Sequence, residues 1–366
     1  MMRLRDVSIE TRLMLVGVAV WDLFIARRPF TDFDHTDFAT FYDTGRAWLG
    51  GTDLYQPVRG SVNLNPPIAT FLFIPFALLP ESIAVSLWML LNLTCIAISL
   101  RIIVRELDLA DSPTTIATGL IFFGLLQPTL HMLWAANLAW ILMLPATLAW
   151  RDARHERDAS AGLWLGFVLA LKPLFLLFIP YWALRRNWRS IAGAVAVGGA
   201  SLLVGWLALG LDAYRSWFEA GRSVTWFGNS MNGSLMGTIS KSVPPVPKDG
   251  VIVLFYLLAA GVIACLGICM LRERNIDREW SLVWIASLLV SPLGWMYYYA
   301  LAAGPLIGTL RWRVRTPAVV AVVVALCIPA PIVYNLAPAQ PAVVWLAATL
   351  SGLATLTLFG VLVARR

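Results

Sequence analysis

The side chains best suited to chemistry gather in one polar segment near the start of the chain. Residues 30–43 read Phe-Thr-Asp-Phe-Asp-His-Thr-Asp-Phe-Ala-Thr-Phe-Tyr-Asp. An aspartate can accept a proton or bind a metal, and a histidine can do either near neutral pH. The segment follows an apolar run, so its carboxylates escape most of the cost of membrane burial, which is of order 2.5–3.5 kcal/mol. The candidates are Asp32, Asp34, His35, Asp37 and Asp43.

Asp37 stands at the start of a helix-like stretch, Asp37 to Leu49, that carries several aromatic residues. A carboxylate is favourable at a helix N-terminus. We expect this helix to lie along the membrane interface, with Asp37 near the mouth of a helical bundle. The alternatives are a solvated loop whose aspartates cap helices, with Asp43 as such a cap, or a metal site formed by Asp32, Asp34 and Asp37.

Lys172 interrupts an apolar run immediately before Pro173. A lysine ammonium is a compact point charge that suits a phosphate, so we predict a contact with a lipid phosphate. The alternative is a lysine whose stem lies in the membrane while its ammonium reaches the interface.

Two later segments carry aromatic and amide side chains. Residues 211–249 contain Trp226, Asn232 and Ser234, which suit sugar binding, although tryptophan is common at membrane interfaces in any case. A second segment, Ser291 to Tyr299, has a Ser-Pro-Leu-Gly-Trp break followed by Met296 and three tyrosines. Three successive tyrosines cannot all face lipid, so some must face the bundle or its outer mouth.

The composition identifies a polytopic membrane protein. Of 366 residues, 59% are hydrophobic and only 13% are charged, against about 25% charged in a typical soluble domain. The mean hydropathy is +0.74. The net charge of +7 comes from arginines in short gaps between apolar runs, as the positive-inside rule expects, so nucleic-acid binding is excluded. The four cysteines lie in apolar runs without metal-ligand spacing.

The apolar runs predict a single all-α transmembrane domain over residues 1–366, with about 12 crossings and a range of 10–13. The arginine-rich gaps and both termini are expected in the cytoplasm, and residues 30–65 and 211–249 form the two outer loops. The runs 160–184 and 279–310 must then turn back on the outer side, at Lys172-Pro173 and at Ser291-Pro292, where proline breaks the helix. How the runs 66–80 and 82–104 cross stays open.

The order of these motifs resembles the family-87 membrane glycosyltransferases of the GT-C superfamily, which are polyprenol-phosphate-mannose-dependent mannosyltransferases. The resemblance covers residues from about 30 to 305. The matching elements are Asp37, Tyr42, Gly50-Gly51-Thr52-Asp53-Leu54-Tyr55, Asn65-Pro66-Pro67, Lys172-Pro173, Asn232-Gly233-Ser234-Leu235 and Ser291-Pro292-Leu293-Gly294-Trp295.

The resemblance implies a GT-C fold and an inverting transfer of a sugar, expected to be mannose, from a polyprenyl-phosphate donor. The acceptor would be lipid-linked or a cell-envelope glycan, on the periplasmic face of a bacterial inner membrane. Asp37 would act as general base and Lys172 would bind the donor phosphate, with no metal required. Further candidates for sugar or acceptor contacts are Asp34, His35, Tyr42, Asn65, Asn232, Ser234, Trp295, Tyr297 and Tyr298.

The chain departs from the family pattern at two places. Family members often have an acidic residue and a histidine where this chain has Met296 and Tyr297, and a Gly-Gln element is replaced by Trp134-Ala135-Ala136-Asn137. Two other functions stay open at this point. A transporter would also use broken helices, and a ligase using a polyprenyl-pyrophosphate donor would use the arginines of the outer loops.

Overall fold

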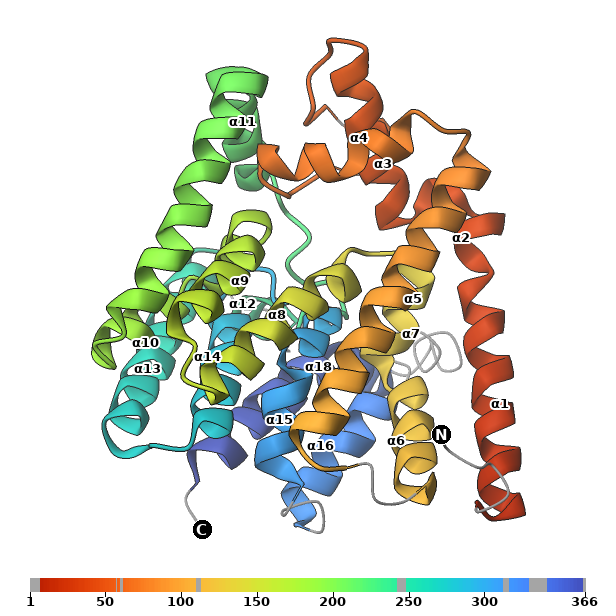
Figure 1. The fold of residues 1–366 in the computed structure, drawn as a ribbon, viewed down its shortest axis with the longest axis vertical. Helices are drawn as coiled ribbons and strands as arrows, with labels where there is room; N and C mark the ends of the chain where they lie inside the picture. The colour runs from red at the N-terminus through yellow and green to blue at the C-terminus, as the bar shows by residue number, and fades with distance from the viewer. Residues whose placement is uncertain are drawn as a thin grey trace.

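The computed structural model describes residues 7–56, 58–59, 62–109, 113–241, 248–311, 316–328 and 341–364. These residues form a bundle of helices, many of which run along the long axis of the molecule (Figure 1). In the described part of the chain, the only extended pairing is a single antiparallel bridge between Asn232 and Trp295. The prediction of an all-α protein is therefore confirmed.

The α-helices are α1 (Ile9–Ala26), α2 (Arg28–Thr31), α3 (Asp37–Leu49), α4 (Thr70–Ala77), α5 (Glu81–Glu106), α6 (Pro113–Leu125), α7 (Gln127–Ala135), α8 (Ala139–Arg154), α9 (Asp158–Leu171), α10 (Phe178–Leu184), α11 (Trp188–Arg222), α12 (Leu235–Ser240), α13 (Lys248–Arg272), α14 (Ile276–Val290), α15 (Ala303–Leu310), α16 (Pro317–Cys327) and α18 (Pro341–Val363). Short 3₁₀ helices are η2 (Phe33–His35), η3 (Pro67–Ala69), η4 (Pro173–Phe175) and η5 (Met296–Ala302).

Three of the described helices, α5, α11 and α13, are long and apolar enough to cross a membrane. A fourth span results if α6 and α7, which meet at a bend of 62°, are counted as one. Only 11% of the most apolar window of α11 is buried inside the protein, so its apolar side chains are available to lipid. These helices fit an integral membrane protein, and the predicted count of about 12 crossings is not confirmed.

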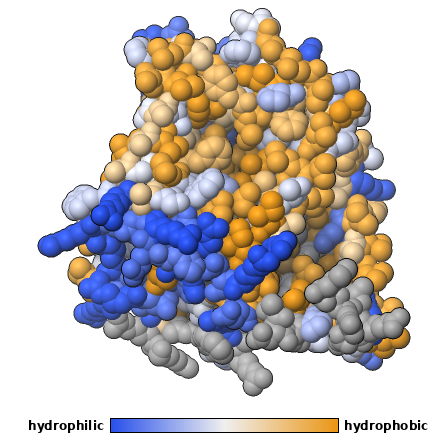
Figure 2. All heavy atoms as spheres, viewed as in Figure 1, coloured by the Kyte–Doolittle hydropathy of each residue, from blue (hydrophilic) through white to orange (hydrophobic). Residues whose placement is uncertain are grey.

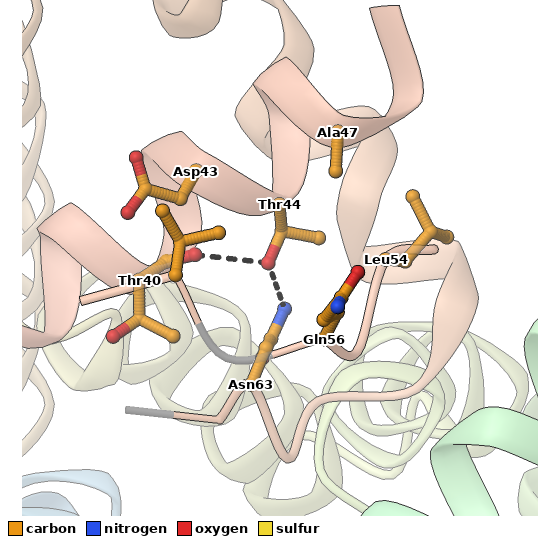
Figure 3. Close-up of a pocket in the computed structure, with 8 residues that line it drawn as sticks. Thr40, Asp43, Thr44, Ala47, Leu54, Gln56 and Asn63 are labelled. Carbon is orange, nitrogen blue, oxygen red and sulfur yellow. Dashed lines mark hydrogen bonds between the residues drawn. The ribbon is translucent and has the colours of Figure 1, made fainter. Parts of the chain in front are cut away.

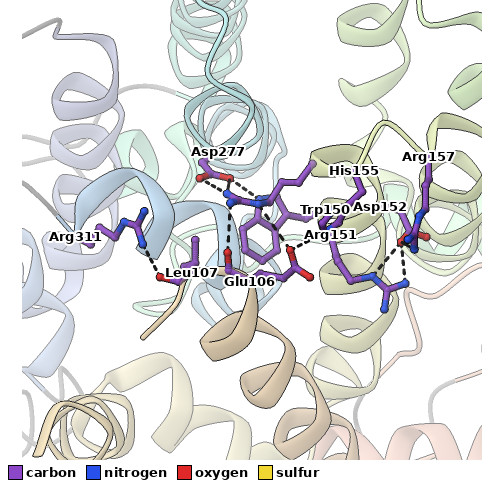
Figure 4. A network of polar contacts seen from close by, with 10 residues as sticks. Glu106, Leu107, Trp150, Arg151, Asp152, His155, Arg157, Asp277 and Arg311 are labelled. Carbon is purple, nitrogen blue, oxygen red and sulfur yellow. Dashed lines mark hydrogen bonds and ion pairs between the residues drawn. The ribbon is translucent and has the colours of Figure 1, made fainter. Parts of the chain in front are cut away.

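Charged side chains join several helix ends at one end of the molecule, which we call the basic end. Asp277 of α14 accepts hydrogen bonds from Arg154 (2.6 Å) and from the indole of Trp150 (2.9 Å), both on α8 (Figure 4). Arg311, at the end of α15, donates to the Leu107 carbonyl oxygen after α5 (2.6 Å). Figure 2 shows the molecule from the same side as Figure 1: hydrophilic residues gather at the lower left, whereas apolar residues cover most of the upper part.

Both predicted helix breaks are present and they pack against each other. Helix α9 ends at Leu171 and η4 begins at Pro173, while α14 ends at Val290 before the break that leads to η5. Proline lacks the N–H that a continuing helix needs. The ring of Phe175 lies 4.4 Å from that of Trp284 and 5.8 Å from that of Tyr298, between centroids. The broken hairpins α9–α10 and α14–α15 therefore meet at their turns.

Small residues fix α9 against α11. A Cβ atom on Gly162 would lie 2.1 Å from the Ser190 carbonyl oxygen, and one on Gly166 would lie 2.8 Å from the Ala194 Cα. Glycines four residues apart allow such close approach of two helix backbones. This packing sets the position of the α9 C-terminus, where Lys172 follows.

The structure resolves how residues 66–80 and 82–104 are arranged. The first run forms η3 and the eight-residue helix α4, which packs on α3 through Phe41 and Phe73, whose ring centroids are 4.6 Å apart. The second run is the long helix α5. Only the second of these runs is long enough to cross a membrane.

The two predicted outer loops, residues 30–65 and 211–249, touch each other. Gly210 (φ 77°) breaks α11, and the following half-helix places the Trp217 indole within 3.1 Å of the Leu64 carbonyl oxygen, to which it donates. The positive φ angle explains why glycine stands at this kink. Together these segments form the end of the molecule that carries Asp37, which we call the Asp37 end.

Candidate active site

Asp37 is the first residue of α3, as the sequence predicts. The Thr36 hydroxyl oxygen caps the helix by accepting a hydrogen bond from the Ala39 N–H (3.1 Å). The Asp37 side chain is partly exposed, and its Oδ2 accepts a hydrogen bond from Asn137 Nδ2 at 2.5 Å. A carboxylate held by one charge-assisted hydrogen bond is suited to accept a proton from a bound hydroxyl.

Asn137 is a residue of this site that sequence reasoning did not select. Its Oδ1 accepts a hydrogen bond from the Ala139 N–H (3.0 Å), which fixes the orientation of the amide and points Nδ2 at Asp37. Ala136 ends α7 in the left-handed conformation (φ 50°, ψ 43°), so the chain turns sharply just before Asn137. The sequence shows that Asn137 belongs to the segment that replaces the Gly-Gln element. It does not show the contact with Asp37, because the two residues are 100 positions apart.

Lys172 lies in the same site, because α9 ends there. Its Nζ is 5.4 Å from the centroid of the Tyr298 ring, which belongs to the other broken hairpin. Lys172 and Asp37 attract each other electrostatically. The structure thus brings together the predicted carboxylate and cation from segments 135 positions apart (172 − 37).

Burial raises the pKa of the Asp37 carboxyl above its ordinary value. Three interactions favour the ionised form and oppose this effect: the hydrogen bond from Asn137, and the charges of Lys172 and Arg28. A carboxylate with a raised pKa is a stronger base than one in water, and the amide and the two cations limit how far burial raises its pKa.

Arg28 is a second cation that sequence reasoning missed. Its guanidinium carbon lies 3.4 Å from the centroid of the Trp134 ring, and its Nη2 is 2.9 Å from Asp32 Oδ2. It also donates from Nη1 to the His35 carbonyl oxygen (3.3 Å). Arg28 follows α1 as the second residue of the pair Arg27-Arg28. A pair of arginines beside an apolar run is typical of a topology signal, so the sequence context did not indicate a role in the site.

Five stacked rings form a column beside Asp37, which we call the aromatic column. Successive centroids are 5.6, 6.1, 5.6 and 5.3 Å apart, and neighbouring planes differ by 14–29°. The two end rings are exposed, and the Tyr297 hydroxyl interacts with Asn137. In order, the rings belong to Trp226, Trp295, Tyr297, His131 and Trp134. Of the predicted contact residues, Tyr297 therefore lies near Asp37, Trp295 stacks on Tyr297, and Tyr298 lies at Lys172.

Asn232 and Ser234 are buried and hold the break after α14. Asn232 Nδ2 donates to the Phe227 and Pro292 carbonyl oxygens (both 2.9 Å), and its Oδ1 accepts from the Gly294 N–H (3.0 Å). The Ser234 hydroxyl donates to the Pro292 oxygen (3.1 Å) and caps α12. The structure gives both residues a positioning role, and their predicted contact with sugar or acceptor stays a prediction.

Tyr42 and Asn65 also have internal partners. The Tyr42 hydroxyl donates to the Leu79 carbonyl oxygen (2.9 Å), and Asn65 Nδ2 donates to Asn63 Oδ1 (2.7 Å). By contrast, Asp34 and His35 are exposed: Asp34 pairs with Arg59 (2.5 Å), and His35 Nδ1 contacts Asp32 Oδ1 (2.5 Å). Asp34 and His35 remain accessible to a ligand, whereas Tyr42 and Asn65 stabilise the fold of residues 30–65.

A small polar pocket lies further along α3, and neither Asp37 nor Lys172 lines it. Thr44 donates to the Thr40 carbonyl oxygen (2.9 Å) and accepts from Asn63 Nδ2 (3.0 Å), while Asp43 points away from this contact (Figure 3). Its internal hydrogen bonds satisfy the side chains of Thr44 and Asn63. We therefore place the chemistry at Asp37 rather than in this pocket.

Comparison with known proteins gives a consistent result. The profile of glycosyltransferase family 87 matches residues 63–292. A polyprenol-phosphate-mannose-dependent alpha-(1-2)-phosphatidylinositol mannoside mannosyltransferase of Mycobacterium tuberculosis is 26% identical over 338 residues, which are 83% of this chain and 77% of that protein. The protein of the same name from Mycolicibacterium smegmatis is 26% identical over 321 residues, 78% of this chain and 71% of that protein.

An alpha-(1->3)-arabinofuranosyltransferase of Corynebacterium glutamicum is 24% identical over 291 residues, which are 75% of this chain and 67% of that protein. No solved structure matches the chain. The family profile covers more than half of the sequence, including Lys172, Asn232 and Ser234. The chain belongs to glycosyltransferase family 87, and the protein is a membrane glycosyltransferase.

Proposed function

We propose that the protein is an inverting mannosyltransferase of GT-C fold that uses a polyprenyl-phosphate mannose donor. The acceptor is a lipid-linked or cell-envelope glycan on the periplasmic face of a bacterial inner membrane. The observation that carries the proposal is the meeting of Asp37 and Lys172 in one site of a family-87 protein. Membership of this family removes the transporter alternative.

In the proposed reaction, an acceptor hydroxyl attacks the anomeric carbon of the donor mannose. Asp37 takes the hydroxyl proton, a new carbon–oxygen bond forms, and the bond between the anomeric carbon and the phosphate oxygen breaks. The electron pair of that bond stays with polyprenyl phosphate, whose growing negative charge is stabilised by Lys172. A single displacement of this kind inverts the anomeric configuration.

Two neighbours support these roles. Asn137 holds the Asp37 carboxylate through a hydrogen bond of 2.5 Å and thereby positions the base. Arg28 adds a second positive charge near Asp37, which favours the ionised carboxylate and would also attract the donor phosphate. Because the leaving group is already a phosphate that two cations can stabilise, we propose that transfer requires no metal ion.

Transfer by the purified protein tests the proposal. The protein is placed in lipid nanodiscs with polyprenyl-phosphate mannose and octyl α-mannoside, in the presence of EDTA, and the product is analysed by NMR. We expect a dimannoside whose new linkage is opposite in configuration to that of the donor. Retained configuration, or hydrolysis of the donor without transfer, would contradict the proposal, and a need for added metal would contradict its metal-free step.

A second sugar is considered because one relative is an arabinofuranosyltransferase. A parallel sample therefore contains polyprenyl-phosphate arabinofuranose in place of the mannose donor. Preferential use of this donor would replace mannose by arabinose and leave the roles of Asp37 and Lys172 unchanged. A third sample with a polyprenyl-pyrophosphate-linked glycan tests the ligase alternative, for which we expect no transfer.

A further inference from the structure

A groove opens on the flank of α3, beside the start of α5 and separate from the site of Asp37. It is open to the surface and has a volume of about 460 Å³, which lies within the roughly 300–1,000 Å³ of typical ligand sites. Its polar wall consists of Asp43, Arg46, Arg59 and Glu81, and an apolar edge is provided by residues 78–80. We call it the α3–α5 groove.

Charges of both signs line the groove. Arg59 forms ion pairs with Asp43 (3.1 Å) and with Glu81, and also reaches Asp34 (2.5 Å). Arg46 is exposed, and it donates a long hydrogen bond to the Ala77 carbonyl oxygen (3.5 Å). Two arginines and two carboxylates thus line the wall, and a third carboxylate, Asp34, pairs with Arg59 from outside the lining. This arrangement disfavours a free anion or cation and offers both donors and acceptors to a neutral ligand rich in hydroxyl groups.

The groove and the site of Asp37 share α3 and the residues before it. The Arg59 guanidinium carbon lies 5.0 Å from the centroid of the Phe33 ring, and its partner Asp34 precedes Asp37 by three residues. Arg46 follows Asp37 by nine residues, which places it about 14 Å further along the helix axis. A ligand in the groove would therefore lie alongside the reacting centre, at a distance greater than one sugar ring.

We infer that the α3–α5 groove binds the non-reacting sugar units of a glycan acceptor while its terminal hydroxyl reaches Asp37. This inference rests on the proposed function and deepens it by naming the acceptor class as an oligosaccharide. Carboxylates and guanidinium groups accept from and donate to sugar hydroxyls, and residues 78–80 offer an apolar surface to the C–H face of a ring.

The inference is tested by acceptor binding without donor, so that catalysis is not required. Octyl trimannoside and octyl monomannoside are titrated against the full protein in nanodiscs, with binding followed by saturation-transfer difference NMR. The variants are Arg46→Ala and Glu81→Gln, and Arg215→Ala, which removes an exposed arginine of the kinked half of α11, is the matched control. Thermal melting followed by tryptophan fluorescence verifies that each variant is folded.

We expect the wild-type protein to bind the trimannoside more tightly than the monomannoside. Each groove variant should weaken trimannoside binding about tenfold, which corresponds to one hydrogen bond with a charged group, and leave monomannoside binding and the control unchanged. Equal trimannoside affinity in wild type and both variants would overturn the inference, as would equal affinity of the wild type for the two acceptors. If binding follows the prediction but no sugar is transferred, the groove stands and the proposed function fails.

Discussion

At the residue scale, two opposing influences act on the Asp37 carboxylate: burial and its polar neighbours. Burial raises its pKa, and the amide of Asn137 together with the charges of Lys172 and Arg28 limits the increase. Asp32, Asp34 and Asp43 differ from Asp37 in that each has a nearby arginine as an ion-pair partner. Asp37 is therefore the aspartate of this segment whose carboxylate is held by an amide.

The first prediction concerns Asn137. Asp37 accepts a proton only when it is ionised, so the rate of transfer falls as the pH drops through its pKa. Asn137→Ala removes a hydrogen bond that favours the ionised form, and the pKa of Asp37 rises further. We expect the acidic limb of the kcat/KM profile to move to higher pH, and to move further in Asn137→Asp, which adds a negative charge.

The control for this experiment is Asn92→Ala. Asn92 is a buried asparagine of α5 whose amide donates to the Trp88 carbonyl oxygen (3.1 Å). Its loss should lower stability without moving the acidic limb. A limb at the same pH in wild type and both Asn137 variants would show that Asn137 does not act on the base.

The second prediction concerns Lys172. Lys172→Met keeps most of the side-chain volume but removes the charge that we propose faces the leaving phosphate. We expect kcat/KM for the polyprenyl-phosphate donor to fall about 100-fold, as for the loss of one group that stabilises transition-state charge. Lys172→Arg should restore part of the rate because it keeps the charge. Donor kinetics unchanged in Lys172→Met would reject the phosphate role.

At the element scale, the site is built by two broken hairpins and by the N-terminal turn of α3. The hairpin turns bring Lys172 and Tyr298 together, and the bend between α7 and α8 supplies Asn137. Each of these elements stops at the site because of a local feature: Pro173, Pro292 and the left-handed residue Ala136. The candidate site thus lies at helix ends, where polar side chains can converge.

The third prediction concerns the packing that places α9. In Gly162→Val, the new side chain meets the backbone of Ser190, with a Cβ only 2.1 Å from its carbonyl oxygen. We expect a loss of stability of about 3 kcal/mol or more, together with a lower kcat/KM for the donor because Lys172 is displaced. A tryptophan-fluorescence melt of the protein in nanodiscs measures the stability.

Gly199→Val provides the matched control for this packing. A Cβ on Gly199 of α11 meets no atom within 4 Å, so the substitution should leave the melting temperature unchanged. Equal melting temperatures for Gly162→Val and the wild type would show that the close contact of α9 with α11 does not fix the site.

Local sequence features could predict much of this architecture. The helix from Asp37 to Leu49 and the breaks at Lys172-Pro173 and Ser291-Pro292 depend on capping and proline chemistry, which act over a few residues. Asn137, Arg28 and the aromatic column could not be predicted, because each is defined by contacts between distant segments. The roles of Asn232 and Ser234 were also hidden, since the sequence does not show which amides are satisfied internally.

At the scale of the whole molecule, two ends with different chemistry are separated by the apolar bundle. Arginine-rich ion pairs join helix termini at the basic end, and Asp37, Lys172 and the aromatic column gather at the opposite ends of the same helices. Helix α8 shows this directly, since it runs from Ala139, next to Asn137, to Arg154, a distance of about 24 Å. The positive-inside rule then predicts that the basic end is cytoplasmic.

The fourth prediction tests this orientation. His35 and Arg157 have side chains that are 73% and 63% exposed, at the Asp37 end and the basic end respectively. We expect a membrane-impermeant maleimide to label His35→Cys in intact cells and to label Arg157→Cys only after the cells are lysed. Labelling of the unsubstituted protein gives the background from its own cysteines. The reverse pattern would place the site of Asp37 on the cytoplasmic side.

The central claim is that Asp37 is the base of a sugar transfer from polyprenyl phosphate. The most direct test compares Asp37→Asn with Asp34→Asn in nanodiscs, using polyprenyl-phosphate mannose and octyl α-mannoside. Both changes replace a carboxylate by an amide of the same shape, three residues apart, but Asp34 pairs with Arg59 and lies away from Asn137. We predict that Asp37→Asn lowers kcat about 1,000-fold while Asp34→Asn retains most of the wild-type rate. A folded Asp37→Asn protein that transfers mannose at the wild-type rate would contradict the claim.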